Sequence, residues 1–436
     1  MASSFRLFKE LVMKYTELDA ASLKREFAAL EEQYKALQAE NLKLDMSRGK
    51  PGTKQLDLST DMLQIMQKPE DLVSESGLDC RNYGVLDGLP ETRKLFAELT
   101  ETSPEQVIVA GNSSLNLMYT LIADAWIYGV MGHTPWGKQE KITFLCPVPG
   151  YDRHFAITES FGIQMIPVPM TPQGPDMDMI EKAVSSDASI KGIWCVPQYS
   201  NPDGYTYSDE TVRRMARLKP LAPDFRLFWD NAYLVHHLDY EDHDSVLDIL
   251  KETEKAGQPD IVYQFVSTSK IVFPGHGLAA FVASKANVDA IKKIMNAQTI
   301  GYDKIIQLEH VRFFGNADGI KEHMKKHAAL LRPRFEVVID HLTELGELGI
   351  AGWTEPKGGY FISLYTLDGC AKRTVQLCRE AGVVLTGAGA AYPYGNDPDD
   401  HHIRIAPTYP AADELKKACE VLVLCAKIAA LEKLLA

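Results

Sequence analysis

Two side chains able to do chemistry stand at the ends of apolar stretches. Lys270 ends the segment STSK, which overlaps the apolar stretch IVYQFVS (261–267). Hydroxyls and apolar residues flank its amine, a setting that can lower the pKa of a lysine and make it a Schiff-base nucleophile, although a surface lysine also fits. Asp230 ends the stretch FRLFWD (225–230). A buried carboxylate needs a partner, so a protonated ligand nitrogen, a protein arginine or exposure at the strand end would each account for it.

Three more segments place polar or aromatic residues after apolar stretches. GNSS (111–114) precedes a helix and offers N–H groups and hydroxyls to a phosphate, as an ordinary helix cap also would. Tyr151, in PGYDRH, is either a stacking platform for a planar ligand or an ordinary loop aromatic. Asn201 begins the turn sequence NPDG, which turn formation alone explains. Taken singly, none of these segments identifies a site.

The elements that position these residues are short β-branched stretches alternating with helices. The stretches are VIVA (107–110), ITFLC (142–146), IQMIPV (163–168), KGIWCV (191–196), FRLFWD (225–230), IVYQFVS (261–267) and LAAFVA (278–283). Strands this apolar are buried on both faces, which predicts an α/β fold with a mainly parallel, seven-stranded sheet between helices. Ligands of such sheets bind at the carboxyl ends of the strands, where the residues above stand.

Towards its two ends, the chain shows a different order of predicted helices and strands. Residues 20–43 predict a helix, because apolar residues recur there at spacings of three and four. A long helix near 318–345 precedes strands, and an amphipathic helix over 411–435 closes the chain. The strands are YFISL (360–364), GVVLT (382–386) and HIRIA (402–406). This pattern predicts an α+β unit.

Composition narrows the function classes. The 436 residues include 46 Lys and Arg against 59 Asp and Glu, a formal net charge of −13. This acidic balance argues against a nucleic-acid-binding protein and against one that relies on anionic lipids. The apolar stretch 115–132 is interrupted by Asn116 and Asp124, so we interpret it as a buried helix and not a membrane span.

The seven cysteines form no CxxC pair, and most stand in apolar stretches. They are typical of buried thiols in a reducing compartment, and not of a disulfide framework or a zinc site. The first residues lack the apolar stretch of a signal peptide. We therefore expect a cytoplasmic protein.

In their order along the chain, these motifs resemble the fold type I aminotransferases that use pyridoxal 5′-phosphate. The order is GNSS, Tyr151, NPDG, DNAY and STSK, and the likeness covers nearly the whole chain. Further matches are NYGVLDGLPETR (82–93), PKGGYF (356–361) and HHIRIAPTYP (401–410). SRGKPG, GNSSLN, PGYDRH and STSK resemble more narrowly the bacterial subgroup Ic aspartate aminotransferases.

The resemblance implies catalytic roles. Lys270 would form the Schiff base and move the proton between the substrate Cα and the cofactor. Asp230 would pair with the protonated pyridine nitrogen, which would supply the partner that a buried carboxylate needs. Asn201 and Tyr233 would hydrogen-bond the phenolic oxygen of the cofactor, and Tyr151 would stack on its ring.

The resemblance also implies binding roles. Arg404 would grip the substrate α-carboxylate with two parallel hydrogen bonds, close to the backbone of Gly49. In a homodimer with shared active sites, the phosphate would be held by Asn112, Ser113, Ser114, Ser267 and the partner subunit's Tyr83. No metal is implied. The large cofactor-binding domain would span 53–320, and a discontinuous small domain would combine 1–52 with 321–436.

The implied activity is ping-pong transfer of the amino group of an L-amino acid, aspartate above all, to a 2-oxo acid such as 2-oxoglutarate. An alanine or broad-specificity aminotransferase and a C–S β-lyase are alternatives, because both would also use these residues. The dicarboxylic substrates require a second cation. The nominees are Arg48, Lys50, Lys304 and Arg312.

One departure from the family concerns the phosphate. Relatives carry an arginine about eight residues after the Schiff-base lysine, where this chain has Leu278 within KIVFPGHGLAAF. His276 is the nearest candidate for a replacement cation. Cofactor affinity is therefore less certain from the sequence than cofactor identity.

Three other function classes are weaker interpretations. The segment 275–280 is a formal GxGxxA, but it precedes a strand, whereas a dinucleotide fingerprint follows one. A regulator with an aminotransferase-like body would need a DNA-binding domain, for which the residues before Ser47 are too few. The segments HHLDYEDHD (236–244) and DPDDHH (397–402) lack the spacing of a closed metal site.

Overall fold

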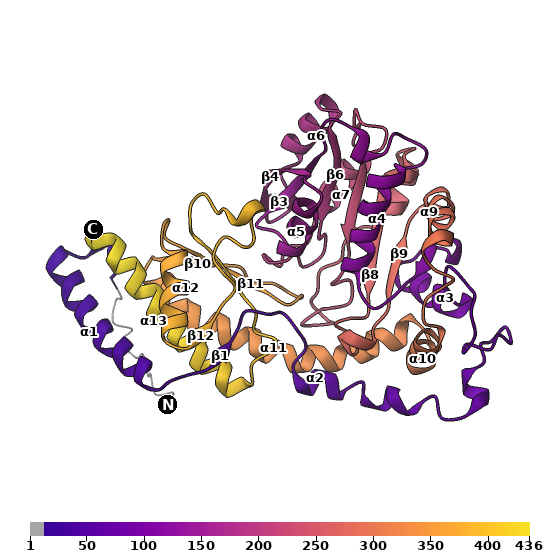
Figure 1. Cartoon of the computed structure of the whole chain (residues 1–436). Coiled ribbons are helices and arrows are strands. Elements are labelled where there is room, and N and C mark those ends of the chain that lie inside the picture. The colour runs from indigo at the N-terminus through magenta and orange to yellow at the C-terminus, as the bar shows by residue number, and fades with distance from the viewer. Residues whose placement is uncertain (1–12) are drawn as a thin grey trace, which may run out of the picture.

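The fold is described from a computed structural model, in which residues 13–436 are described. Residues 1–12 of the predicted small domain lie outside them. The centre of the fold is an eight-stranded sheet ordered β2-β9-β8-β7-β6-β3-β4-β5 (Figure 1). The strands are β2 (Val107–Val109), β3 (Thr143–Val148), β4 (Gln164–Thr171), β5 (Gly174–Pro175), β6 (Ile190–Cys195), β7 (Arg226–Asp230), β8 (Val262–Ser267) and β9 (Ala279–Val282).

The sheet confirms the predicted α/β fold class. Strands β4, β3, β6, β7 and β8 run parallel, while β9 is antiparallel to both β8 and β2. All seven predicted strands form, and the two-residue β5 adds an eighth at the edge. Because β2 runs in the same direction as β8, the carboxyl ends of six strands meet at one edge of the sheet.

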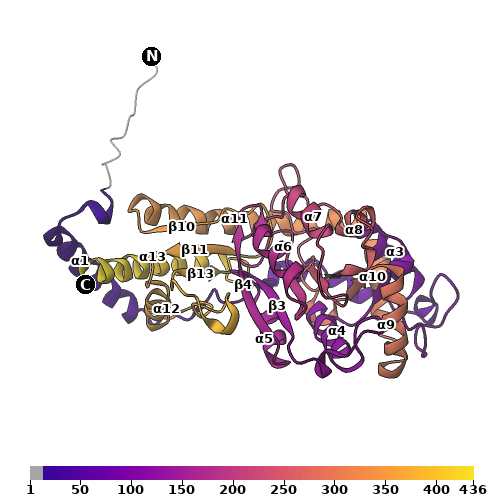
Figure 2. The same cartoon turned by 90° about the horizontal axis from the view of Figure 1, so that it is seen from above.

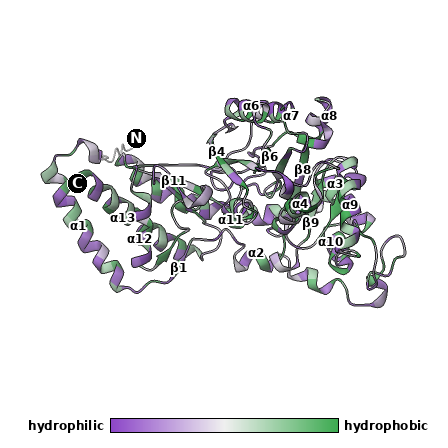
Figure 3. Ribbon diagram, turned by 45° about the horizontal axis from the view of Figure 1, so that its top comes forward, coloured by the Kyte–Doolittle hydropathy of each residue, from purple (hydrophilic) through white to green (hydrophobic). Residues whose placement is uncertain are grey.

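Helices cover both faces of this sheet. They are α3 (Pro90–Leu99), α4 (Ser114–Tyr128), α5 (Asp152–Ser160), α6 (Met177–Ser186), α7 (Asp209–Ala216), α8 (Ile249–Lys255), α9 (Lys285–Gln298) and α10 (Lys304–Phe314). The side chain of Ser208 caps α7 by accepting from the backbone N–H of Thr211. Figure 3 shows hydrophilic and hydrophobic residues mixed along α6 and α7, as expected for helices between a core and water.

A second part of the chain lies beside the main sheet (Figures 1 and 2). It contains an antiparallel sheet of β10 (Ala351–Trp353), β11 (Ile362–Thr366) and β13 (His402–Ile405), and a parallel pair of β1 (Leu44–Asp45) with β12 (Val383–Val384). Its helices are α1 (Ala20–Ala39), α12 (Ala371–Glu380) and α13 (Ala412–Leu435). The long α11 (Ala317–Glu347) extends beneath both parts, and the short α2 (Thr53–Asp57) lies against it.

Helix α13 differs from its prediction as an amphipathic helix. Its residues 421–426 are buried without interruption, because α1, α11 and α12 pack around it. All seven cysteines are free and buried, as predicted. Within residues 13–436, no helix is both long enough and apolar enough to cross a membrane.

A buried polar cluster fixes the segment that carries Lys270. Gln55 on α2 is hydrogen-bonded to His327 on α11 over 3.1 Å and donates to the hydroxyl of Tyr360 over 3.0 Å. His327 lies 3.2 Å from His323, and the Tyr360 hydroxyl donates to the carbonyl of Lys270 over 3.4 Å. Hydrogen bonds thus connect α2, α11 and Tyr360 to the backbone of Lys270, although these segments are far apart in sequence.

We predict that His327 makes the protein less stable in acid. Burial lowers the pKa of His327 to about 3, whereas an unfolded histidine has a pKa of about 6.5. Below pH 6.5 the unfolded chain therefore binds a proton that the folded protein rejects until the pH approaches 3. The free energy of unfolding should fall by about 1.4 kcal/mol per pH unit for this group.

Urea unfolding between pH 7.5 and 4.5 measures this slope. His327→Gln should lower the slope of the unfolding free energy against pH by about 1.4 kcal/mol per pH unit, the equivalent of one proton. His133→Gln, at an exposed position, should leave this slope unchanged. A slope in His327→Gln equal to that of the wild type would contradict the prediction.

Candidate active site

The strand-end residues meet in one cavity of about 190 Å³ at the carboxyl edge of the main sheet. Eight residues named from the sequence line it: Ser113, Ser114, Tyr151, Asn201, Asp230, Tyr233, Ser267 and Lys270. They follow or end β2, β3, β6, β7 and β8. The parallel strands bring them together because their carboxyl ends share an edge.

The carboxylate of Asp230 is held deep in this cavity by a histidine. Nε2 of His154 lies 3.0 Å from Oδ2 of Asp230, and both side chains are less than 5% exposed. The His154 ring stacks on Trp194 with centroids 4.4 Å apart. Oδ1 of Asp230 is buried and has no hydrogen-bond partner among residues 13–436. Of the three explanations left open by the sequence, a protein arginine and solvent exposure are therefore wrong.

The amine of Lys270 lies among aromatic rings in the same cavity. Nζ is 5.1 Å from the ring centroid of Tyr233 and 5.8 Å from that of Tyr360. Burial lowers the pKa of Lys270, and the charge of Asp230 partly opposes that shift. A lowered pKa leaves more of the amine uncharged and nucleophilic. Burial likewise raises the pKa of Tyr151 to about 12, so its hydroxyl keeps its proton.

The end of the cavity near α4 is built from hydroxyls and a helix N-terminus. The hydroxyl of Ser113 accepts from the backbone N–H of Asn116 and so caps α4. Ser269 lines the cavity and donates to the carbonyl of Asn112 over 2.9 Å. Asn112 itself does not line the cavity, because its amide donates to the carbonyl of Pro274. Such an end suits an anion.

Arg404 adjoins the cavity from β13. Nη1 donates to Oδ1 of Asp152 over 2.8 Å and to Oδ1 of Asn201 over 3.4 Å. The ring of Phe361 lies 4.9 Å from the guanidinium, and an added Cβ on Gly49 would come within 2.3 Å of that ring. The predicted pair of Gly49 and Arg404 is therefore close through Phe361, and only a glycine fits there without rearrangement.

Two sequence nominees lie elsewhere in the described structure. Tyr83 is 79% exposed and does not line the cavity of its own chain. His276, the candidate for the missing arginine, is paired with Glu309 and is also outside the cavity lining. Among the residues that line the cavity, the basic side chain is that of Lys270.

The four cations nominated for a distal carboxylate have different surroundings. Arg312 donates to the carbonyl of Val73, Lys50 lies over the ring of Tyr409 at 3.7 Å, and Lys304 is buried. Arg48 is exposed beside Gly49. None of the four lines the cavity, so the position of a second cation stays a prediction.

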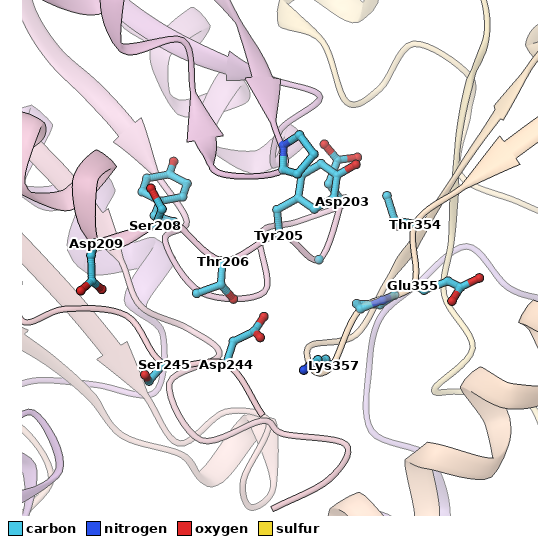
Figure 4. Close-up of a pocket in the computed structure, with 14 residues that line it drawn as sticks. Asp203, Tyr205, Thr206, Ser208, Asp209, Asp244, Ser245, Thr354, Glu355 and Lys357 are labelled. Atoms are coloured by element: carbon cyan, nitrogen blue, oxygen red, sulfur yellow. The ribbon is translucent and has the colours of Figure 1, made fainter. Parts of the chain in front are cut away.

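A larger hollow, of about 380 Å³, lies between residues 203–209 and 354–357. Figure 4 shows Asp203 and Tyr205 on one side and Thr354 and Glu355 on the other. Its lining includes none of the site residues predicted from the sequence, and Lys357 there is paired with Asp242.

The 397–402 segment brings one potential metal-ligand atom each from Asp397, Asp399 and His401 within 4.8 Å of one another. Asp397 accepts the backbone N–H groups of Asp399, His401 and His402. These hydrogen bonds explain its burial through loop structure. For the 236–244 segment, no such group of three forms among residues 13–436.

Sequence reasoning missed three residues at the site. They are Asp152, His154 and Ser269. His154 had a usable signal, because it stands three residues after Tyr151 at the start of a helix, a spacing that brings side chains to one face. The ring centroids of these two residues are 4.9 Å apart. Asp152 and Ser269 had no such signal.

Comparison with known proteins gives a consistent result. Residues 18–436 match the family described as aspartate amino-transferase. A putative aminotransferase of Mycolicibacterium smegmatis is 46% identical over 97% of this chain and 99% of its own length. An aspartate aminotransferase of Corynebacterium glutamicum is 43% identical over 92% of this chain and 93% of its own.

Solved structures agree. An aspartate transaminase from Corynebacterium glutamicum has a TM-score of 0.93 at 41% identity, covering 97% of this chain and 99% of its own. An α-aminoadipate aminotransferase from Thermus thermophilus, complexed with N-(5′-phosphopyridoxyl)-L-leucine, has a TM-score of 0.72 at 17% identity, covering 95% of this chain and 96% of its own. The latter shares the fold.

We predict that His154 stabilises the folded protein through Asp230. His154→Ala would remove the donor to a buried carboxylate and the ring stacked on Trp194, at a cost of about 1–3 kcal/mol for the lost hydrogen bond alone. His154→Gln can still donate and should lose less. Urea unfolding of the cofactor-free protein measures both, and equal stability of His154→Ala and the wild type would refute the role.

Proposed function

This chain belongs to the aspartate aminotransferase family and is an aminotransferase, and from that premise we propose its cofactor, substrates and residue roles. It uses pyridoxal 5′-phosphate and moves the amino group of an L-amino acid, aspartate above all, to a 2-oxo acid such as 2-oxoglutarate by a ping-pong mechanism. It does so as a cytoplasmic homodimer. A non-catalytic regulator is set aside because the family is enzymatic.

The observation that carries the proposal is Oδ1 of Asp230, which has no hydrogen-bond partner within residues 13–436. A buried carboxylate oxygen without a donor is costly, and a protonated ring nitrogen would supply the missing hydrogen bond and charge. Lys270 lines the same cavity, with an amine whose pKa is lowered. The residues present therefore fit the cofactor.

When bound, the cofactor supplies an aldehyde that takes up amino groups and a ring that withdraws electrons from the substrate Cα. Lys270 would attach it through that aldehyde and, once the substrate amine has taken its place, would accept the proton from Cα at Nζ and return it. Asp230, fixed by His154, would keep the ring nitrogen protonated. Tyr151 would lie against the ring and restrict its tilt.

Asn201 and Arg404 would orient the two reacting partners. Oδ1 of Asn201 accepts from Arg404, which leaves the amide N–H groups to donate to the phenolic oxygen together with the hydroxyl of Tyr233. Arg404 would bind the α-carboxylate and so set which bond of Cα faces Lys270. Retention of that carboxylate favours amino transfer over decarboxylation.

The phosphate would bind at the N-terminus of α4, held by Ser113, Ser114 and Ser267. Asn112, also expected there from the sequence, would first have to release its amide from the carbonyl of Pro274. The partner subunit's Tyr83 would complete the site. The high exposure of Tyr83 in a single chain supports this assignment, because a ring that is 79% exposed in one subunit is available to another. The large domain over 53–320 would carry this end of the site, and the small domain over 1–52 and 321–436 would carry Gly49 and Arg404.

Aspartate is favoured as donor because a relative 43% identical to this chain is an aspartate aminotransferase. An alanine or broad-specificity aminotransferase and a C–S β-lyase are the alternatives. They differ in the amino acid that reacts and in the product released.

We predict that Lys270→Ala abolishes turnover, by about a thousandfold or more, and removes the borohydride-reducible attachment of the cofactor. The change removes both the anchoring amine and the proton carrier. Lys285→Ala is the matched control, because this lysine is exposed and paired with Asp289 on α9. Retained transamination in Lys270→Ala would sink the assignment.

A half-reaction screen tests the substrates. Each amino acid is added alone to the purified holoenzyme, and absorbance reports conversion from the aldehyde to the amine form. We expect aspartate to convert it and 2-oxoglutarate to restore it. Conversion by alanine but not by aspartate would support the alanine enzyme, and release of pyruvate and ammonia from a sulfur amino acid would support the lyase.

A further inference from the structure

Arg404 is already engaged by a carboxylate of its own chain. Its Nη1 is shared between Asp152, at 2.8 Å, and Asn201, at 3.4 Å. Nη2 donates to Oγ1 of Thr386 over 3.4 Å, and the buried Nε lacks a hydrogen-bond partner within the described part of the chain. A two-pronged grip on an incoming carboxylate requires two adjacent donors. Because Nε is buried, we take the Nη1–Nη2 edge as the one that a ligand reaches, and Asp152 occupies Nη1 of that edge.

Asp152 is placed so that it can release the arginine. Its side chain is 32% exposed, whereas that of Arg404 is 9% exposed. As the first residue of α5, Asp152 lies near the N–H groups of a helix start, which favour a negative charge without any ion pair. When the ion pair breaks, water and the helix terminus can therefore stabilise the carboxylate, whereas neither is available to the guanidinium.

The ion pair also joins the two parts of the chain. Helix α5 packs against β4 of the main sheet, and Arg404 stands on β13 in register with Ser363 of β11. Two residues next to Asp152 in sequence also belong to the site. Tyr151 lines the cavity, and His154 holds Asp230. Asp152 is thus fixed opposite Arg404 by residues on which the site depends.

We propose that Asp152 is an internal competitor for Arg404, which a substrate α-carboxylate must displace from Nη1 in order to bind. The proposal rests on the carboxylate-binding role of Arg404 proposed above. Two anions compete for one guanidinium, so the charge of Asp152 weakens binding of the amino donor and of the 2-oxo acceptor by the same factor. Asp152 does not touch the reacting atoms, so it sets KM more than kcat.

The test uses the holoenzyme and propionate, which has a carboxylate but no amino or oxo group to react. In Asp152→Asn the inhibition constant of propionate and the KM of both substrates should fall about two- to fivefold, with kcat changed less. Asp152→Ser, which also removes the charge, should show the same fall. Asp152→Glu, which keeps the charge, should retain the wild-type values.

Asp178→Asn is the matched control, because it removes an exposed carboxylate that is ion-paired with Arg214 on the surface. It should leave propionate binding unchanged. Propionate binding that is unchanged or weaker in both Asp152→Asn and Asp152→Ser would overturn the proposal, since Asp152 would then position Arg404 and not compete for it.

Arg404→Lys separates this inference from the function on which it depends. It should weaken propionate binding about tenfold, because a lysine cannot form two parallel hydrogen bonds to a carboxylate. An unchanged inhibition constant in Arg404→Lys would remove the proposed role of Arg404 itself. Weakening in Arg404→Lys without tightening in Asp152→Asn would remove the competition alone.

Discussion

A carboxylate at the end of a buried strand is the constraint around which this site is organised. Asp230 lies where water does not reach it, and the one donor that it receives from residues 13–436 comes from His154. Trp194 in turn fixes the histidine ring. Oδ2 is thereby satisfied, while Oδ1 has no hydrogen-bond partner among residues 13–436. A protonated nitrogen is the partner that we propose for it, because an unpaired buried carboxylate oxygen is costly.

Burial in the same cavity lowers the pKa of Lys270. Desolvation favours the uncharged amine, while the charge of Asp230 favours the protonated one. The Tyr360 hydroxyl, held by Gln55, fixes the lysine backbone from below. Lys270, the proposed nucleophile, and Asp230 thus line one cavity although the elements that carry them are far apart in sequence.

The polar groups around Arg404 differ from those at the α4 end of the cavity. On the main-sheet side, hydroxyls and the start of α4 offer hydrogen bonds with little cationic charge. On the other side, a guanidinium is shared between Asp152 and Asn201. His276 does not restore the missing phosphate cation, because Glu309 engages it. The two ends proposed to bind anions therefore differ: one offers hydroxyls and a helix N-terminus, and the other offers a guanidinium already paired with Asp152.

The sequence by itself determined seven of the eight strands of the main sheet, the strand ends at which polar residues gather, and Lys270, Asp230 and Asn201 as candidates. It could do so because burial on both faces leaves a continuous apolar stretch, and parallel strands must present their carboxyl ends together. Strands β1, β5 and β10, of two or three residues, do not lie in such an apolar stretch and were not predicted. Likewise, only the tertiary structure decided that His154 holds Asp230 and Asp152 holds Arg404, because each contact joins residues 76 or 252 positions apart through packing that no local spacing encodes.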